Sequence, residues 1–189
     1  MSKKIVIAED EPITRMDIAE ILTEAGYDVV GMASDGFDAV EMCKNLKPDL
    51  VLMDIKMPLL DGLKASRVLL EEKIVSCVVI LTAYSTREFI NEAKSIGIMG
   101  YVVKPVNEKN LLPAIEIAIA KDEEINYMKE SIEKAKEDLK ARKLIEKAKG
   151  ILMKKGNITE EEAYNMIRKL SMDKRAPMKD IAKAIIMNR

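Results

Sequence analysis

The regular alternation of two hydrophobic patterns over residues 1–120 is the feature that most restricts the fold of this chain. Short apolar runs rich in β-branched residues fall at about 3–8, 28–33, 49–53, 77–82 and 99–103. Amphipathic stretches of helical period fall between them, at about 12–25, 36–46, 61–72, 85–96 and 107–120. Strands that alternate with helices form a parallel sheet covered by helices on both faces. Five such units predict an α/β, flavodoxin-like, five-stranded parallel domain over residues 1–120.

The pattern changes after residue 120, where the fifth helix is predicted to continue. From Ala114 to about Lys155 there is no proline and only one glycine. Apolar residues recur there at intervals of 3, 4, 3 and 4, namely at Ile125, Met128, Ile132, Ala135 and Leu139. These heptad positions predict that residues 121–140 form a helical linker, and they favour a parallel coiled-coil dimer along it. In such a dimer Glu124 faces Lys129 of the second helix, and Asp138 faces Lys143. The alternative is one amphipathic helix packed on its own domain, because the repeat is shorter than three to four heptads.

Residues 141–189 are predicted to form a small three-helix domain whose first helix extends the coil. The pair Gly156-Asn157 ends that helix. A capping box, Thr159-Glu-Glu-Glu162, begins a second helix that runs to about Leu170. After a linker at 174–177 the last helix spans about Met178–Met187.

The two parts of the chain differ in charge. Residues 1–120 carry 13 Lys/Arg against 19 Asp/Glu, a net of −6, whereas residues 139–189 carry 14 against 6, a net of +8. The basic tail suggests a polyanionic partner, with a solvated helical surface as the simpler alternative.

Several functional classes are excluded by composition. The chain has no histidine, which removes the commonest general base and the usual transition-metal ligand. It also cannot carry a phosphohistidine of its own. Cys43 and Cys77 both lie in apolar patterns and are expected to be reduced core thiols. No stretch approaches the length of a membrane span, so we expect a cytoplasmic protein with no membrane partner.

Polar side chains follow the predicted strands at the points where the strands end. Glu9 and Asp10 follow the first run, Asp54 the third, Thr82 the fourth and Lys104 the fifth. The carboxyl ends of parallel strands meet at one rim, where ligands bind. A carboxylate such as Asp54 accepts a phosphoryl group when a hard cation such as Mg²⁺ relieves charge repulsion.

The other two strand-end groups suit the same chemistry. Lys104 can pair with phosphate oxygens, and Thr82 can donate a hydrogen bond to another. Pro105 restricts the loop that directs Lys104, by a cis peptide bond if the turn requires one.

These residues resemble, in order, the signature of the bacterial response-regulator receiver domain. The matching segments are Glu9-Asp10, Asp54-Ile-Lys-Met-Pro58 with Asp61-Gly62, Thr82-Ala83-Tyr84, Tyr101 and Lys104-Pro105. The resemblance implies that a sensor histidine kinase phosphorylates Asp54. It also implies that Asp10, Asp54 and the Lys56 carbonyl bind Mg²⁺ while Glu9 assists through water. Thr82 and Tyr101 are then the switch pair.

The basic tail resembles the ANTAR domain, a family of three-helix RNA-binding antiterminator modules. The resemblance covers about residues 136–187 and is strongest at Ala148-Lys-Gly-Ile-Leu-Met153. It implies RNA binding, with tandem hairpins in leader transcripts as the target of a homodimer formed on phosphorylation. The whole layout resembles the ethanolamine-utilisation antiterminator of Gram-positive bacteria. Our candidate RNA contacts are Arg142, Lys143, Lys147, Lys149, Lys154, Tyr164, Arg168, Lys174 and Arg175.

The sequence thus predicts a phosphorylation-controlled antiterminator rather than an enzyme. Tyr164 suits base stacking, although core packing near Ile167 is an alternative. The competing function is a DNA-binding response regulator. The last helix argues against it, because that helix is apolar, whereas a DNA-recognition helix is basic. A third possibility is a tail that serves only protein interaction or dimerisation. The tail has no histidine, cysteine or clustered acids for catalysis.

Overall fold

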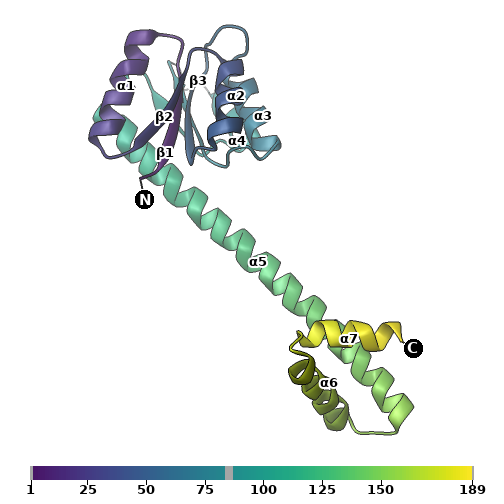
Figure 1. Ribbon diagram of the computed structural model, residues 1–189. Coiled ribbons are helices and arrows are strands. Elements are labelled where there is room, and N and C mark those ends of the chain that lie inside the picture. Colours follow the sequence, from purple (N-terminus) through teal and green to yellow (C-terminus); the bar gives the residue numbers. More distant parts are fainter. Residues whose placement is uncertain (1, 84–86, 189) are drawn as a thin grey trace. The chain divides into compact units, whose positions relative to one another are not determined.

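The computed structural model describes residues 2–83 and 87–188. The chain forms two compact units, Met1–Ile125 and Asn126–Arg189. In the first unit, strands and helices alternate as the sequence predicts (Figure 1). The strands are β1 (Lys4–Ala8), β2 (Asp28–Ala33), β3 (Leu50–Asp54), β4 (Val78–Thr82) and β5 (Gly100–Val103). The helices between them are α1 (Pro12–Glu24), α2 (Gly36–Leu46), α3 (Gly62–Glu71) and α4 (Arg87–Ile96).

The five strands form one parallel sheet in the order β2-β1-β3-β4-β5. Side chains of successive strand residues point to opposite faces, so each buried strand contributes to two cores. Ile5 and Ile7 of β1 pack with Leu22 of α1 and Ile115 of the last helix of the unit. Val6 of β1 and other strand residues pack with α2 and α3 on the opposite face. The predicted flavodoxin-like architecture is confirmed.

The fifth helix, α5, runs without interruption over Glu108–Gly156. It therefore continues through the predicted coil and supplies the first helix of the second unit. Residues 127–140 are all exposed. Among the heptad residues, which we call the seam, Met128, Ile132 and Leu139 expose 50%, 56% and 55% of their surface. This exposure contradicts the alternative in which the amphipathic stretch packs against its own domain.

The second unit is completed by α6 (Glu160–Lys174) and α7 (Met178–Met187). Ala148 of α5, Ile167 of α6 and Ala182 of α7 are fully buried at its centre. The capping box is present, since Thr159 accepts from the Glu162 amide and the Glu162 side chain accepts from the Thr159 amide. Helix α6 extends four residues beyond the predicted end at Leu170, and Arg175 in the left-handed conformation ends it.

No described helix combines the length and the apolar character needed to cross a membrane. The thiols of Cys43 and Cys77 are both buried and free. Burial raises the pKa of each to about 12, which keeps them protonated and unreactive.

Candidate functional site

The register of the sheet explains why the strand-end residues meet. Ala8 of β1 lies beside Met53 of β3, and Asp54 lies beside Leu81 of β4. The residue after β1, Glu9, is therefore next to Asp54, and Thr82 ends the adjacent strand. Lys104 follows β5, and its amide donates to the Thr82 carbonyl at 2.8 Å. Its bond to Pro105 is cis.

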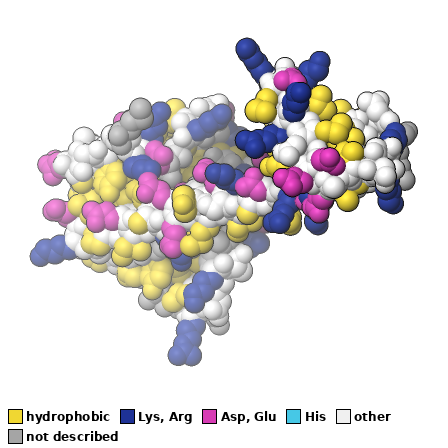
Figure 2. Space-filling model, turned by 90° about the horizontal axis from the view of Figure 1, so that it is seen from below, with side chains coloured by type: hydrophobic (Ala, Val, Ile, Leu, Met, Phe, Trp, Pro, Cys, Tyr) yellow, Lys and Arg dark blue, Asp and Glu magenta, His cyan; other side chains and the backbone are white. Residues whose placement is uncertain are grey.

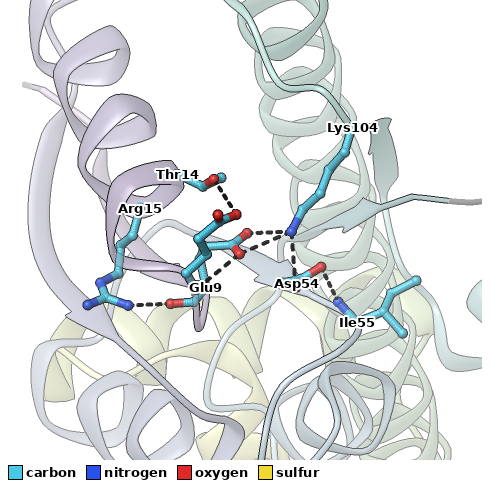
Figure 3. A network of polar contacts seen from close by, with 7 residues as sticks. Glu9, Thr14, Arg15, Asp54, Ile55 and Lys104 are labelled. Atoms are coloured by element: carbon cyan, nitrogen blue, oxygen red, sulfur yellow. Dashed lines mark hydrogen bonds and ion pairs between the residues drawn. The ribbon is translucent and has the colours of Figure 1, made fainter.

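Lys104 joins the two buried carboxylates of the site (Figure 3). Its Nζ lies 3.0 and 2.8 Å from the two carboxylate oxygens of Glu9 and 3.1 Å from Oδ2 of Asp54. Glu9 is fully buried and Asp54 is 5% exposed. The single ammonium is thus the principal counter-charge for two carboxylates that have little contact with water.

Burial dominates the protonation behaviour of these carboxylates. It raises the pKa of Glu9 and of Asp54, and the contacts with Lys104 offset only part of that rise. Burial by itself would lower the pKa of Lys104, but its hydrogen bonds to Glu9 and Asp54 outweigh that effect and the pKa is raised. The cluster therefore favours a further positive charge at neutral pH.

The acidic cluster fits a divalent cation. Glu9, Asp10 and Asp54 each place a carboxylate oxygen within 4.8 Å of the others. Three carboxylates against one ammonium leave two negative charges. In addition, Oε2 of Glu9 is buried and accepts no well-formed hydrogen bond from any described residue, although it lies in the ion pair with Lys104. Oxygen ligands of this kind suit Mg²⁺.

The turn after β3 presents Asp54 to a cavity of about 180 Å³, which is also lined by Ile55, Lys56, Thr82, Ala83, Phe89 and Lys104. The Ile55 amide donates to Oδ1 of Asp54 at 2.9 Å. The Gly62 amide closes the turn by donating to the Ile55 carbonyl at 2.9 Å. A Cβ at Gly62 would lie 1.9 Å from the Asp54 carbonyl oxygen, so only glycine allows this close approach.

The predicted switch residues occupy different environments. Thr82 is buried beside Asp54, whereas Tyr101 is 42% exposed. The Tyr101 ring meets Phe89 of α4 edge to face, with 6.4 Å between ring centroids. Tyr84, which belongs to the same predicted motif, lies outside the described residues.

Two residues of the site were missed from the sequence. Phe89 lines the cavity, but nothing in its helical pattern distinguishes it from a core residue. Arg15, in the second turn of α1, donates to the backbone carbonyl of Glu9 (Figure 3). A basic residue so soon after two acids was a usable signal, because α1 begins at the same rim.

Eight of the nine candidate RNA contacts lie on the surface of the second unit. Tyr164 is 42% exposed, while Ala163 and Ile167 form the buried side of α6, so the ring does not belong to the core. The exposed basic candidates are Arg142, Lys143, Lys147, Lys154, Arg168, Lys174 and Arg175. Figure 2 shows Lys and Arg side chains projecting into solvent on the face drawn, with Asp and Glu side chains between them.

Lys149 is the exception among these candidates. Its side chain is only 8% exposed, and its Nζ lies 2.7 Å from Glu146 and 2.6 Å from Glu160. These contacts raise the pKa of Lys149 and lower that of Glu160. Because Glu160 begins α6, Lys149 connects two helices of its own unit, and its ammonium does not point into solvent.

Comparisons with known proteins agree with this geometry. Residues 5–116 match the family described as response regulator receiver domain, and residues 133–186 match the ANTAR domain. The chain is 42% identical to the transcriptional regulatory protein PdtaR of Mycobacterium tuberculosis over 184 residues, which cover 97% of this chain and 89% of PdtaR. The chain is a response regulator with an ANTAR domain.

Two further relatives of this response regulator cover only the first unit. The chemotaxis protein CheY of Thermotoga maritima is 34% identical over 115 residues, which cover 61% of this chain and 96% of that protein. The structure of the chemotaxis protein CheY4 of Vibrio cholerae superposes with a TM-score of 0.59 at 25% identity. It covers 62% of this chain and 99% of that structure. The predictions of a receiver and of an ANTAR domain are both confirmed.

Proposed function

We propose that the response regulator receives a phosphoryl group on Asp54 from a sensor histidine kinase and, as a homodimer, binds RNA hairpins to cause transcription antitermination. The observation that carries the first half is the buried Glu9–Lys104–Asp54 arrangement beside an open cavity. The second half rests on the ANTAR match together with the exposed basic residues of the second unit.

The transfer requires a donor outside the chain, because the sequence contains no histidine. A carboxylate oxygen of Asp54 attacks the phosphorus of a phosphohistidine. The new O–P bond forms as the N–P bond breaks, and the imidazole nitrogen keeps the electron pair. Lys104 lies beside the attacking carboxylate and pairs with a phosphoryl oxygen, and the Thr82 hydroxyl donates to another.

Glu9, Asp10, Asp54 and the backbone carbonyl of Lys56 would hold Mg²⁺. When bound there, the cation neutralises the charge that accumulates as an anionic phosphoryl group approaches three carboxylates. Its ligands are supplied by the turns after β1 and β3, which the sheet register keeps adjacent.

The phosphoryl group changes the chain through Thr82 and Tyr101. Lys104 and Thr82 move toward the new oxygens, and space beside Phe89 becomes available to the Tyr101 ring. We take the half-exposed ring, which meets Phe89 edge to face, as the resting arrangement. The moved ring alters the surface of α4, β5 and α5 and so biases association.

Dimerisation uses the seam on α5 formed by Ile125, Met128, Ile132, Ala135 and Leu139. Met128, Ile132 and Leu139 expose half or more of their apolar surface, which favours association with a second copy. A parallel dimer brings two ANTAR units to one RNA and so raises the effective concentration of the second unit for a second hairpin. The assignment to ethanolamine utilisation, as opposed to another set of genes, remains a prediction.

The experiment combines sizing and RNA titration on the full chain. Wild type, Asp54→Ala and the control Asp28→Ala, an exposed carboxylate at the start of β2, are each treated with Mg²⁺ and beryllofluoride as a phosphoryl analogue. A synthetic RNA of two linked hairpins is titrated against each sample at one salt concentration. We expect the analogue to promote dimers and tighter RNA binding for wild type and Asp28→Ala, but not for Asp54→Ala.

Equal RNA binding by wild type and Asp54→Ala under all conditions would refute control by Asp54. A duplex DNA of matched length tests the competing function. Tighter binding to that duplex than to the hairpins would favour a DNA-binding regulator. Binding to neither nucleic acid, with dimerisation retained, would leave only a protein-interaction module.

A further inference from the structure

Helix α5 carries, in the second unit, a row of exposed lysines that begins before residue 141, where the predicted three-helix domain starts, and continues into that domain. Successive members are separated by seven, four, three, four and seven residues: Lys129, Lys136, Lys140, Lys143, Lys147 and Lys154. Since an α-helix turns by about 100° per residue, these spacings place all of them within a sector of about 60°. No other residue between 127 and 156 falls in that sector. We call this set the lysine stripe.

Every member of the lysine stripe is exposed. Within the described chain, the one ion pair found for the stripe joins Lys136 to Glu133 at 3.5 Å, with both side chains more than half exposed. Such a pair contributes little and is readily replaced by a stronger anion. Lys149 provides the contrast: it lies about 150° from the centre of the stripe, is buried and contacts two carboxylates.

A dimer formed through the α5 seam leaves the lysine stripe accessible. The centre of the stripe lies about 70° around the helix from the centre of the seam. Lys140 occupies an outward-facing heptad position, and Lys147 and Lys154 follow the end of the seam at Leu139. Lys129, Lys136 and Lys143 border the seam, where Lys129 and Lys143 face Glu124 and Asp138 of the second helix. In the parallel register Lys136 faces Ser131 of the second helix, so no acidic residue opposes it.

We propose that the lysine stripe binds the phosphate backbone of the RNA, so that the RNA-binding surface continues along α5 to the N-terminal side of residue 141. This inference rests on the proposed RNA-binding function and adds Lys136 and Lys140, which the predicted coil pairs do not use, to its contacts. The stripe spans about 38 Å at 1.5 Å per residue, which is long enough for several phosphates. Its charge has one sign along that whole length, and lysine contacts phosphates without reading bases. The lysine stripe therefore supplies affinity, while specificity comes from the three-helix unit.

The test is the salt dependence of RNA binding by the full chain. The double variant Lys136→Gln/Lys140→Gln removes two charges of the lysine stripe. Neither lysine takes part in the ion pairs predicted between the two helices of the coil. The control is Lys134→Gln, an exposed lysine of the same segment that lies about 150° from the stripe. The probe is a fluorescent RNA of two hairpins joined by a single strand, titrated at several salt concentrations, and sizing establishes that all proteins have the same oligomeric state.

Each lost phosphate contact lowers the slope of log affinity against log salt by about 0.9 for paired RNA and about 0.7 for single strands. We therefore expect the double variant to lose about 1.4 to 1.8 from the slope. At about 0.2 M salt this corresponds to a weakening of about 10- to 20-fold. Lys134→Gln should keep the wild-type slope.

Two outcomes overturn the inference for different reasons. If wild type binds the RNA and the double variant has the same slope, the lysine stripe is a solvated surface and the proposed function stands. If wild type does not bind RNA, the proposed function fails and this inference fails with it. Equal loss of slope for Lys134→Gln would show a non-specific charge effect and also overturn the assignment to one face.

Discussion

Replacing Lys104 with methionine is the most informative test of the electrostatics at the candidate site. Methionine keeps most of the apolar stem but removes the ammonium that contacts Glu9 and Asp54. Both carboxylates remain buried, and the group that offset part of their pKa rise is gone. Removing one member of a buried ion pair costs about 3–5 kcal/mol. Because the Lys104 side chain is 24% exposed, we expect the low end, about 3 kcal/mol.

The pH dependence of this loss follows from the direction of the pKa shifts. An acid whose pKa is raised on folding binds its proton more tightly in the folded state. Stability is then greatest below the unfolded values, near 3.8 for Asp54 and 4.5 for Glu9, and falls as pH rises through the raised folded values. Lys104→Met raises those folded values further. The difference in stability from wild type should therefore be largest near pH 7 and shrink toward pH 4.

Hydrogen exchange of the β1 and β3 amides, measured without Mg²⁺ across that pH range, reports the opening free energy of the receiver alone. Lys94→Met, at an exposed lysine of α4, is the control and should change stability by less than about 0.5 kcal/mol. Equal protection of Lys104→Met and wild type at pH 7 would refute the argument that Lys104 is the main counter-charge. A loss independent of pH would instead indicate altered packing.

The other predictions concern the cation, the turns and the second unit. Mg²⁺ at 100 times its dissociation constant should raise receiver stability by about 2.7 kcal/mol, and a calorimetric scan in which Mg²⁺ has no effect would contradict a cation site. Gly62→Ala should lower the free energy of unfolding by about 1–3 kcal/mol, measured by urea unfolding. It should also distort the backbone at Asp54, which would appear as a loss of analogue-induced dimerisation. Thr159→Ala should destabilise the second unit by about 1 kcal/mol through loss of the cap, measured by exchange of the α6 amides. Lys149→Met should lower the midpoint for thermal unfolding of this unit, whereas Lys147→Met, at an exposed position, should leave it unchanged.

The sequence predicted most of the candidate site around Asp54 because of a property of parallel sheets. Every strand of such a sheet ends at the same rim, so polar residues after separate apolar runs are brought together whatever the strand order. Glu9, Asp54 and Lys104 could be grouped on that basis alone. Phe89 could not, because its position depends on how α4 packs, which local patterns do not report. Arg15 follows the two acids closely at the same rim, so the sequence did contain a signal for it.

The basic tail shows where charge patterns stop being informative. Lys147 and Lys149 are both lysines in a helical, charged segment, and their sequence neighbourhoods give no reason to separate them. Only the packing of α6 on α5 places Glu160 beside Lys149 and leaves Lys147 in solvent. Likewise the heptad pattern left open whether the seam was covered by its own domain, and the exposure of residues 127–140 decided that question.

By itself the sequence determined the α/β architecture, the two families, the grouping of polar residues around Asp54 and the helix boundaries marked by Gly156 and Thr159. These features depend on periodicity, on chain-local turn and cap chemistry, and on the shared rim of a parallel sheet. Only the tertiary structure decided which charged side chains are already paired within the protein and which are exposed to a ligand. Lys104 is committed to two buried carboxylates and Lys149 to two acids of its own unit, while the lysine stripe on α5 remains exposed. The pairing of a charge depends on distances between residues far apart in the chain, and those distances exist only after folding.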